Sequence, residues 1–256
     1  MNTAEPLLVV EHVTMTFSGI TALSDVSLNV GERELVGLIG PNGAGKTTLF
    51  NCVSGALRPQ EGKLRLGGRS LDGLPTHRRA RLGLGRTFQR IELFAGMTVR
   101  DHLLVAERAR LGTGRFWKDV LNLSKPTADE EARTDRTLAL LGLEGEGDRA
   151  VEALSLGRAR LVEVGRALMT EPKLLLLDEP SSGLDAHETE ALADTLRAVQ
   201  AERGTAVLLV EHDVDFVRSF STRLSVLDFG TLIATGPTAQ VLADDAVRRA
   251  YLGELV

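Results

Sequence analysis

Cysteine and long apolar runs are both scarce in this sequence of 256 residues. Its single cysteine, Cys52, cannot form an internal disulfide, which is typical of a protein from a reducing compartment. The longest obvious apolar runs, 174–177 and 206–210, fall far short of the roughly 18 to 20 residues that a membrane helix needs. The N-terminus carries glutamates where a secretory signal has basic residues. These absences argue against a membrane span and predict a cytosolic protein.

An excess of basic charge is also lacking. The 30 lysines and arginines are outnumbered by 35 aspartates and glutamates, which leaves a net charge of -5. Such a balance does not indicate a general affinity for nucleic acid or for anionic lipid. The sequence has no low-complexity tract and no internal repeat, and 43% of its residues are hydrophobic, as in an ordinary globular protein.

Hydrophobic periodicity divides the chain into three stretches. Period-two alternation in residues 7–17 and 22–30 predicts two antiparallel strands near the N-terminus. Residues 89–155 have helical spacing and little strand character, so we expect them to form a helical subdomain. The remainder, 1–88 and 156–256, should form the core, in which apolar strands alternate with helices. This alternation predicts an α/β fold with a mostly parallel sheet covered on both faces, beside an N-terminal antiparallel β subdomain.

The most specific motif is a glycine-rich stretch, Gly40-Pro41-Asn42-Gly43-Ala44-Gly45-Lys46-Thr47, followed by Thr48. It matches the pattern G-x-x-x-x-G-K-[ST] of phosphate-binding loops, and it lies between a predicted strand and a predicted helix. The glycines let backbone N–H groups turn toward one anion, Lys46 reaches the terminal phosphates, and the Thr47 hydroxyl ligates Mg²⁺. The motif therefore predicts a P-loop NTPase core of the RecA-like type that binds ATP and Mg²⁺.

Two adjacent carboxylates, Asp178 and Glu179, end the apolar run 174–177. Consecutive strand residues face opposite ways, so the two side chains cannot do the same job. We assign Asp178 to Mg²⁺ and Glu179 to the polarisation of the water that attacks the γ-phosphate. Paired acids after a strand are by themselves more often a helix N-cap, but the phosphate loop upstream favours the catalytic interpretation.

The order of these and further motifs resembles the ATP-binding subunits of ABC transporters over nearly the whole chain. Phe17 is placed where that family stacks an aromatic side chain on adenine. Gln89 in RTFQR corresponds to the glutamine that contacts Mg²⁺ and senses the membrane subunit, and His212 in EHD to the switch histidine. Taken alone, Phe17 could equally be sheet core and His212 a structural histidine. The resemblance implies nucleotide contacts for both.

Two further motifs imply a site that is shared between subunits. Leu154 to Arg158 resemble the family signature LSGGQ, and Ser182 to Asp185 resemble the D-loop. Ser155 and Gly157 precede a predicted helix, where a hydroxyl and exposed N–H groups can face an anion. The sequence departs from the common form at Leu156, which replaces glycine, and at Arg158, which replaces glutamine. The resemblance implies that these residues act on ATP bound to a second ATPase subunit, in a head-to-tail pair. The residues concerned are Ser155, Leu156, Gly157, Arg158 and Asp185.

Finer features resemble the ATPase subunits of branched-chain amino acid importers, namely GPNGAGKTTLFNCVSG, GRTFQRIELFAGMTVRDHLLVA and the terminal AYLGE. The resemblance implies a peripheral position at the cytoplasmic face of the cell membrane. It also implies two membrane permease subunits, a related or identical second ATPase subunit and, indirectly, an extracytoplasmic solute-binding protein as partners, and no nucleic acid. Apolar residues around Gln89 form either a groove for a short permease helix or packing within the helical subdomain. These are Phe88, Ile91, Leu93, Phe94 and Met97.

Two alternatives stay open. The same ATPase chemistry could serve another cargo, such as urea, short amides or an extracted lipid, because the ATPase never touches the cargo. Alternatively, an ABC-type ATPase could act on ribosomes or DNA, or be an inactive structural partner. A ribosome-type protein should have two cassettes and a basic linker, and an inactive partner should lack the catalytic acid or the switch histidine. This sequence has one cassette and retains both Glu179 and His212.

Overall fold

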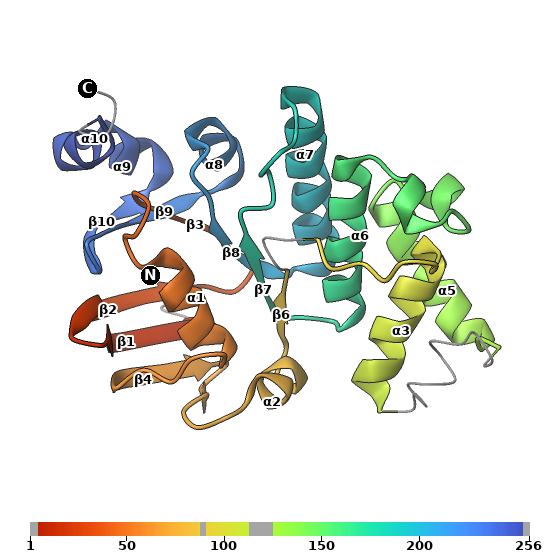
Figure 1. The fold of residues 1–256 in the computed structure, drawn as a ribbon, viewed down its shortest axis with the longest axis horizontal. Coiled ribbons are helices and arrows are strands. Elements are labelled where there is room, and N and C mark those ends of the chain that lie inside the picture. Colours follow the sequence, from red (N-terminus) through yellow and green to blue (C-terminus); the bar gives the residue numbers. More distant parts are fainter. Residues whose placement is uncertain (1–4, 88–90, 113–124, 253–256) are drawn as a thin grey trace.

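Two sheets organise the protein, which is described here by a computed structural model covering residues 5–87, 91–112 and 125–252 (Figure 1). The first sheet has four strands in the order β2-β1-β4-β5, and all its pairings are antiparallel. Its strands are β1 (Leu8–Phe17), β2 (Ile20–Val30), β4 (Glu61–Leu66) and β5 (Arg69–Ser70). The predicted N-terminal β subdomain is thus present.

The second sheet has six strands in the order β10-β9-β3-β8-β7-β6. Its pairings are parallel except that of β9 with β10, which is antiparallel. The strands are β3 (Leu35–Ile39), β6 (Leu84–Arg86), β7 (Leu174–Asp178), β8 (Ala206–Val210), β9 (Arg223–Asp228) and β10 (Thr231–Pro237). The mostly parallel sheet is as predicted, whereas the edge strand β6 was not, because it is too short to display a period.

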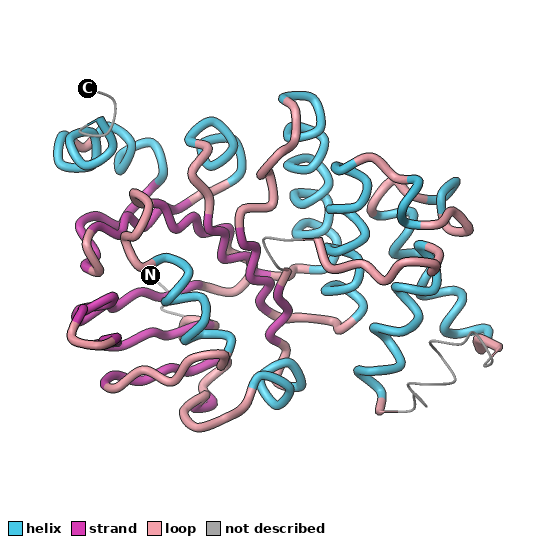
Figure 2. Tube along the Cα trace, in the orientation of Figure 1, coloured by secondary structure: helices cyan, strands magenta, loops and turns pink. Residues whose placement is uncertain are grey.

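Helices cover the parallel sheet and extend away from it (Figure 2). They are α1 (Lys46–Ser54), α2 (Thr76–Arg81), α3 (Val99–Leu111), α5 (Ala128–Leu140), α6 (Leu156–Met169), α7 (Ala186–Arg203), α8 (Val214–Phe220), α9 (Thr238–Ala243) and α10 (Asp245–Leu252). Short 3₁₀ turns span Glu144–Glu146 and Val151–Ala153. Helices α9 and α10 were not predicted from the sequence pattern.

The central strands are buried on both faces, which explains their continuous apolar composition. Every residue of β3, β7 and β8 is buried. Along β7, Leu175 and Leu177 belong to a core that includes residues of α6 and α7, while Leu174 and Leu176 belong to a core shared with α1 and the antiparallel sheet. Alternate side chains of one strand thus fill two separate cores.

Helices α3 and α5 lie at the end of the molecule opposite the antiparallel sheet (Figure 1). Both begin at a capping box, formed by Thr98 with Asp101 in α3 and by Thr127 with Glu130 in α5. The acidic residues 129–131 lie in the first turn of α5, where negative charge interacts favourably with the helix dipole. Both helices pack against α6. The boundary of the predicted helical subdomain at residue 155 stays a prediction.

Among residues 5–87, 91–112 and 125–252, we find no helix with both the length and the apolar character needed to cross a bilayer.

Candidate nucleotide-binding site

The glycine-rich stretch forms the connection between β3 and α1. Gly45 is the N-cap residue of α1, in the left-handed conformation with φ 102°, and no side chain caps this helix. A β-carbon on Gly45 would lie 2.4 Å from the carbonyl oxygen of Ala22, and one on Gly40 would lie 2.0 Å from that of Leu227. Neither position can hold a side chain. The loop therefore directs an uncapped helix N-terminus at the space in front of it, which favours an anion.

The Lys46 side chain folds back and hydrogen-bonds to the loop that precedes it. Its ammonium group donates hydrogen bonds to the carbonyl oxygens of Gly40 (2.5 Å) and Pro41 (2.9 Å), and its side chain is buried, with the residue 6% exposed. Thr47 and Thr48 follow in the first turn of α1, where Thr47 is exposed and Thr48 is half-buried. The loop thus presents a hydroxyl to solvent beside a lysine that already faces carbonyl oxygens.

The β9–β10 turn supports the loop from its other side. Gly230 N–H donates to the carbonyl oxygen of Ala44 (3.0 Å), and Ser24 N–H on β2 donates to the carbonyl oxygen of Gly230 (2.8 Å). The antiparallel sheet, the turn and the phosphate loop are therefore joined by backbone hydrogen bonds. At the far end of β1, Phe17 is 41% exposed and begins the hairpin turn to β2. Its ring is accessible enough to meet a planar ligand.

Asp178 ends β7 and is 4% exposed. An Arg86 guanidinium nitrogen on β6 donates to its Oδ2 at 3.0 Å. Burial raises the pKa of the Asp178 carboxyl group, and the hydrogen bond and charge of Arg86 oppose that rise. Arg86 also donates to Asn51 Oδ1 and Ser54 Oγ, both at 2.8 Å, so it ties the end of β7 to α1. Arg86 was not predicted as a site residue, although it lies in the stretch GRTFQR beside Gln89.

Glu179 and His212 follow neighbouring strands and lie close together. His212 Nδ1 is 4.0 Å from Glu179 Oε2. Glu179 has a left-handed backbone with φ 48°, and its N–H donates to the carbonyl oxygen of Val210 at 2.9 Å. The turn this backbone imposes after β7 leaves Glu179 half-buried and its neighbour Asp178 buried. His212 is exposed. The two adjacent carboxylates thus have different surroundings, one facing Arg86 and the other His212.

The predicted glutamine, Gln89, lies outside the described residues, as does Phe88. Of the other apolar residues near it, Met97 is buried and Leu93 packs against a core. Phe94 is exposed, stacks on His102 with ring centroids 5.9 Å apart, and lies 5.6 Å from the Arg166 guanidinium. Packing therefore accounts for Met97 and Leu93, and the groove for a permease helix stays a prediction.

The signature residues begin α6. Ser155 is the N-cap residue, its Oγ accepts from Arg158 N–H (3.3 Å), and its hydroxyl donates to Glu188 Oε1 on α7 (3.1 Å). Asp185 caps α7 by accepting from Glu188 N–H at 2.8 Å. Glu188, which the sequence analysis did not single out, therefore connects two helix N-termini. A β-carbon on Gly157 would lie 2.9 Å from Glu188 Oε1, so a side chain at this position would displace the end of the Glu188 side chain.

The two departures from the common signature have different surroundings. Leu156 is exposed, and its side chain lies beside Gly183 of the predicted D-loop. Arg158 donates to the carbonyl oxygen of Gly142 (2.6 Å) and pairs with Glu146 (3.3 Å). The guanidinium group is thus held by the segment that precedes the signature in the same chain.

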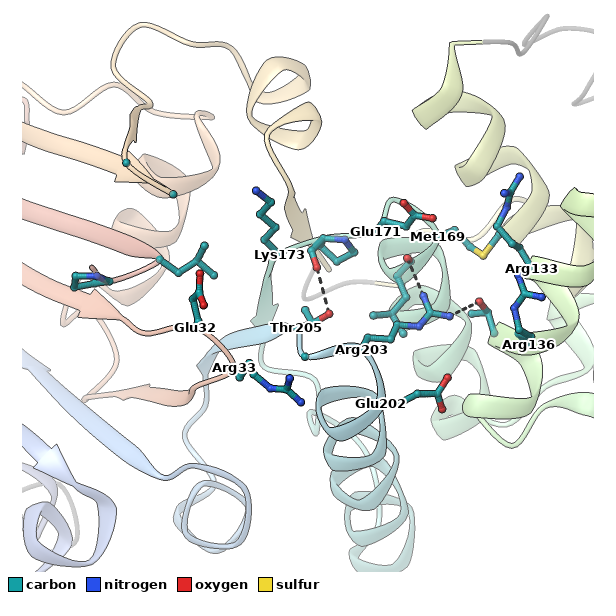
Figure 3. A pocket seen from close by; sticks show the side chains of 18 of the residues that line it. Glu32, Arg33, Arg133, Arg136, Met169, Glu171, Lys173, Glu202, Arg203 and Thr205 are labelled. Atoms are coloured by element: carbon teal, nitrogen blue, oxygen red, sulfur yellow. Dashed lines mark hydrogen bonds between the residues drawn. The ribbon is translucent and has the colours of Figure 1, made fainter. Parts of the chain in front are cut away.

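A cleft of about 940 Å³ lies where β7 and β8 begin, at the end of the parallel sheet opposite the phosphate loop (Figure 3). Side chains of both charge signs line it, including Arg133, Glu171, Lys173 and Glu202. Arg203 spans one side by donating to Thr137 Oγ1 (2.7 Å) and to the carbonyl oxygen of Leu168 (3.2 Å). Its described lining includes none of the predicted site residues.

A phosphate loop at an uncapped helix N-terminus, next to strand ends that carry carboxylates, defines a P-loop nucleotide-binding protein. The chain belongs to the ABC transporter family, whose sequence pattern matches residues 23–182, more than half of its length. A second pattern, described as branched-chain amino acid ATP-binding cassette transporter, matches residues 231–255. The chain is therefore an ATPase coupled to transport, and the predicted family and activity are confirmed.

Several characterised proteins are similar along their whole length. The identity is 41% to the high-affinity branched-chain amino acid transport ATP-binding protein LivG of Salmonella typhimurium, covering 98% of this chain and 99% of that protein. It is 40% to BraF, of the same description, from Pseudomonas aeruginosa, with the same coverage. It is 34% to the lipopolysaccharide export system ATP-binding protein LptB of Haemophilus influenzae, covering 97% and 98%.

Solved structures agree with the fold. The ADP conformation of MJ1267, an ATP-binding cassette of an ABC transporter, has a TM-score of 0.86 and 30% identity, covering 98% of this chain and 100% of that one. The cassette MJ0796 in a dimeric post-hydrolysis state bound to ADP and Pi has a TM-score of 0.74 and 25% identity, covering 90% and 98%. The predicted fold class is confirmed.

Proposed function

We propose that the chain powers the uptake of branched-chain or related hydrophobic amino acids from the cytoplasmic face of the cell membrane. The observation that carries this proposal is the similarity to LivG and BraF over the whole chain, together with the match of residues 231–255 to the branched-chain pattern. The phosphate loop contributes nothing to the choice of cargo, because transporters of other solutes need the same triphosphate contacts.

We assign ATP to the space in front of residues 40–48. The N-terminus of α1 and the Lys46 ammonium group would receive the phosphates, and the carbonyl oxygens that now accept from Lys46 would give way to phosphate oxygens. A helix N-terminus alone supplies roughly 0.3 to 2 kcal/mol toward an anion, so Lys46 must carry much of the affinity. Phe17 would stack on the adenine, an interaction that contributes about 1 to 3 kcal/mol.

Thr47, Gln89 and Asp178 are the proposed Mg²⁺ ligands. A hydroxyl, an amide and a carboxylate are oxygen donors of the kind that Mg²⁺ prefers, in combination with substrate phosphates. Burial raises the pKa of Asp178, and the charges of Arg86 and of Lys46 in the phosphate loop oppose that rise. When bound, Mg²⁺ would offset the charge that develops on the phosphates. Within this chain, Arg86 holds Asp178 in place before any cation arrives.

Glu179 and His212 are the proposed catalytic pair. Glu179 Oε2 would accept a proton from the attacking water, and His212 would donate a hydrogen bond to the γ-phosphate. Their 4.0 Å separation lets one substrate group lie against both side chains. The half-buried position of Glu179 keeps the carboxylate within reach of water.

The second half of each site would come from a neighbouring ATPase subunit, identical or related, in head-to-tail arrangement. Ser155 and the N-terminus of α6 would face the γ-phosphate bound to that subunit, and Asp185 would lie at the contact between them. Residues 89–155, proposed as a separate helical subdomain, would transmit closure to two permease subunits. The exposed ring of Phe94 is the proposed contact for a short permease helix.

The identity of the transported solute is tested by purifying the chain together with the permeases and the solute-binding protein encoded beside it. ATP hydrolysis by the reconstituted complex should rise with leucine, isoleucine or valine. If only urea or short amides stimulate ATP hydrolysis, or if hydrolysis depends on an extracted lipid, then that compound is the cargo instead.

A further inference from the structure

Glu211 directly follows β8, and its carboxylate has no exposed surface. Its Oε1 accepts two hydrogen bonds from Ser181, from the backbone N–H at 2.9 Å and from the hydroxyl at 2.6 Å. Its Oε2 accepts from the backbone N–H groups of His212 (3.1 Å) and Asp213 (3.5 Å). These four groups are donors, and the ring nitrogen Nδ1 of His212 lies 3.8 Å from the same Oε2. A buried carboxylate is costly unless several hydrogen bonds compensate it, and here they do.

The two oxygens of Glu211 serve two different loops. Ser181 belongs to the loop after β7, which leads from Glu179 to the α7 cap Asp185. His212 belongs to the loop after β8. Because a carboxylate is planar and rigid, one side chain holds both loops at a set separation. An amide could not replace it, since an amide offers one acceptor oxygen and would turn its NH₂ group toward donors.

We propose that Glu211 is a positioning residue for ATP hydrolysis, which places His212 beside Glu179 and fixes the start of the loop leading to Asp185. This inference rests on the proposed roles of Glu179 and His212. Glu211 acts on the hydrolytic step and not on nucleotide binding, because the phosphate loop is held by Lys46 and by the Gly230 to Ala44 hydrogen bond.

The kinetic test compares variants of the reconstituted transporter. In Glu211→Gln, kcat should fall about tenfold to a hundredfold, since a displacement of about 1 Å can reduce turnover by that much, while the KM for ATP stays within about twofold. Glu211→Asp keeps both acceptor oxygens and should recover part of the lost turnover. The control is Glu190→Gln, which changes an exposed carboxylate of α7 and should turn over like the wild type.

Hydrogen exchange in the full chain supplies a second readout. Glu211→Gln should speed amide exchange in both residues 178–184 and residues 210–214, and leave residues 40–50 unchanged. Ser181→Ala removes one hydroxyl contact and should affect only the first of these two segments. If Glu211→Gln does not fold, Ser181→Ala still tests whether the contact with Glu211 slows exchange in residues 178–184.

Wild-type kcat in Glu211→Gln, or a loss of kcat matched by an equal loss of ATP affinity, would overturn the inference. Faster exchange throughout the chain would also overturn it, because the role would then be general stability. Failure of the proposed function is a distinct result, since Glu179→Gln would then hydrolyse ATP like the wild type.

Discussion

Two regions of the site differ in whether the hydrogen bonds that hold them are buried or exposed. One region comprises the strand ends around the phosphate loop, and the other comprises the paired N-termini of α6 and α7. Lys46, Asp178 and Glu211 are buried and have buried or half-buried partners. Ser155 and Arg158 are exposed and have partners at the surface. Hydrogen bonds in a low-dielectric interior are strong and hold one geometry, whereas surface contacts are readily exchanged. One region is therefore organised within the chain, and the other is ready to change partners.

The largest effect should come from Glu179→Gln, which alters chemistry in the organised region without altering its shape. Turnover should fall by about 10² to 10⁴, the range for loss of a general base, because an amide cannot accept the proton of water. ATP binding should persist, since the phosphate loop is intact. Single-turnover hydrolysis and a nucleotide titration measure the two quantities separately, and hydrolysis near the wild-type rate would reject the role.

Lys46→Ala should weaken nucleotide binding by roughly 10- to 150-fold, the equivalent of one hydrogen bond to a charged group. The reason is that the ammonium group is the buried cation of the loop. Lys63→Ala changes an exposed lysine on β4 and serves as the control for net charge. Equal affinities of Lys46→Ala and wild-type protein in a calorimetric titration would contradict the assignment.

The buried ion pair between Arg108 and Glu130 lies away from the nucleotide site, so its loss should affect stability alone. Arg108 on α3 donates to both carboxylate oxygens of Glu130 on α5, at 2.9 and 3.1 Å. Glu130→Gln should lower the free energy of unfolding by about 1 to 3 kcal/mol at pH 7, while glutamine retains the capping contact to Thr127. Chemical denaturation measures the difference, and Glu131→Gln on the exposed side of α5 is the control.

The ion pair of Arg108 and Glu130 also predicts that the stability of the fold depends on pH. The hydrogen bond from Arg108 lowers the pKa of Glu130 below its ordinary value of 4.5. A lowered folded-state pKa stabilises the protein fully above the unfolded-state pKa, and the stabilisation is lost as pH falls through the folded-state value. The gap between wild type and Glu130→Gln should therefore shrink below about pH 4.5. A gap that stays constant in acid would exclude the ion pair as its source.

The smallest effect should come from Ser155→Ala, in the exposed region. The isolated chain should bind ATP as before, because Ser155 contacts Glu188 and not the phosphate loop of its own chain. The ATP concentration for half-maximal turnover of the assembled transporter should rise about five- to tenfold, as expected for one exposed hydrogen bond. A binding defect in the isolated chain would contradict the comparison between the two regions.

Local patterns were sufficient for most elements of the fold. Alternation predicted β1 and β2, and the leucine run predicted β7, because each depends on which faces of one strand are buried. Strand β6, which has three residues, was not predicted. Nor were α9 and α10, two short C-terminal helices. Such short elements owe their conformation to neighbours rather than to a period.

The sequence by itself determined the phosphate loop, since the glycine and lysine spacing at 40–47 is a requirement of local backbone geometry. Only the tertiary structure decided which buried side chains support the site. Arg86 meets Asp178 across 92 positions, and Ser181 meets Glu211 across 30. These contacts depend on the strand order β3-β8-β7-β6. A local pattern does not specify strand order, because order follows from how the whole sheet buries its faces.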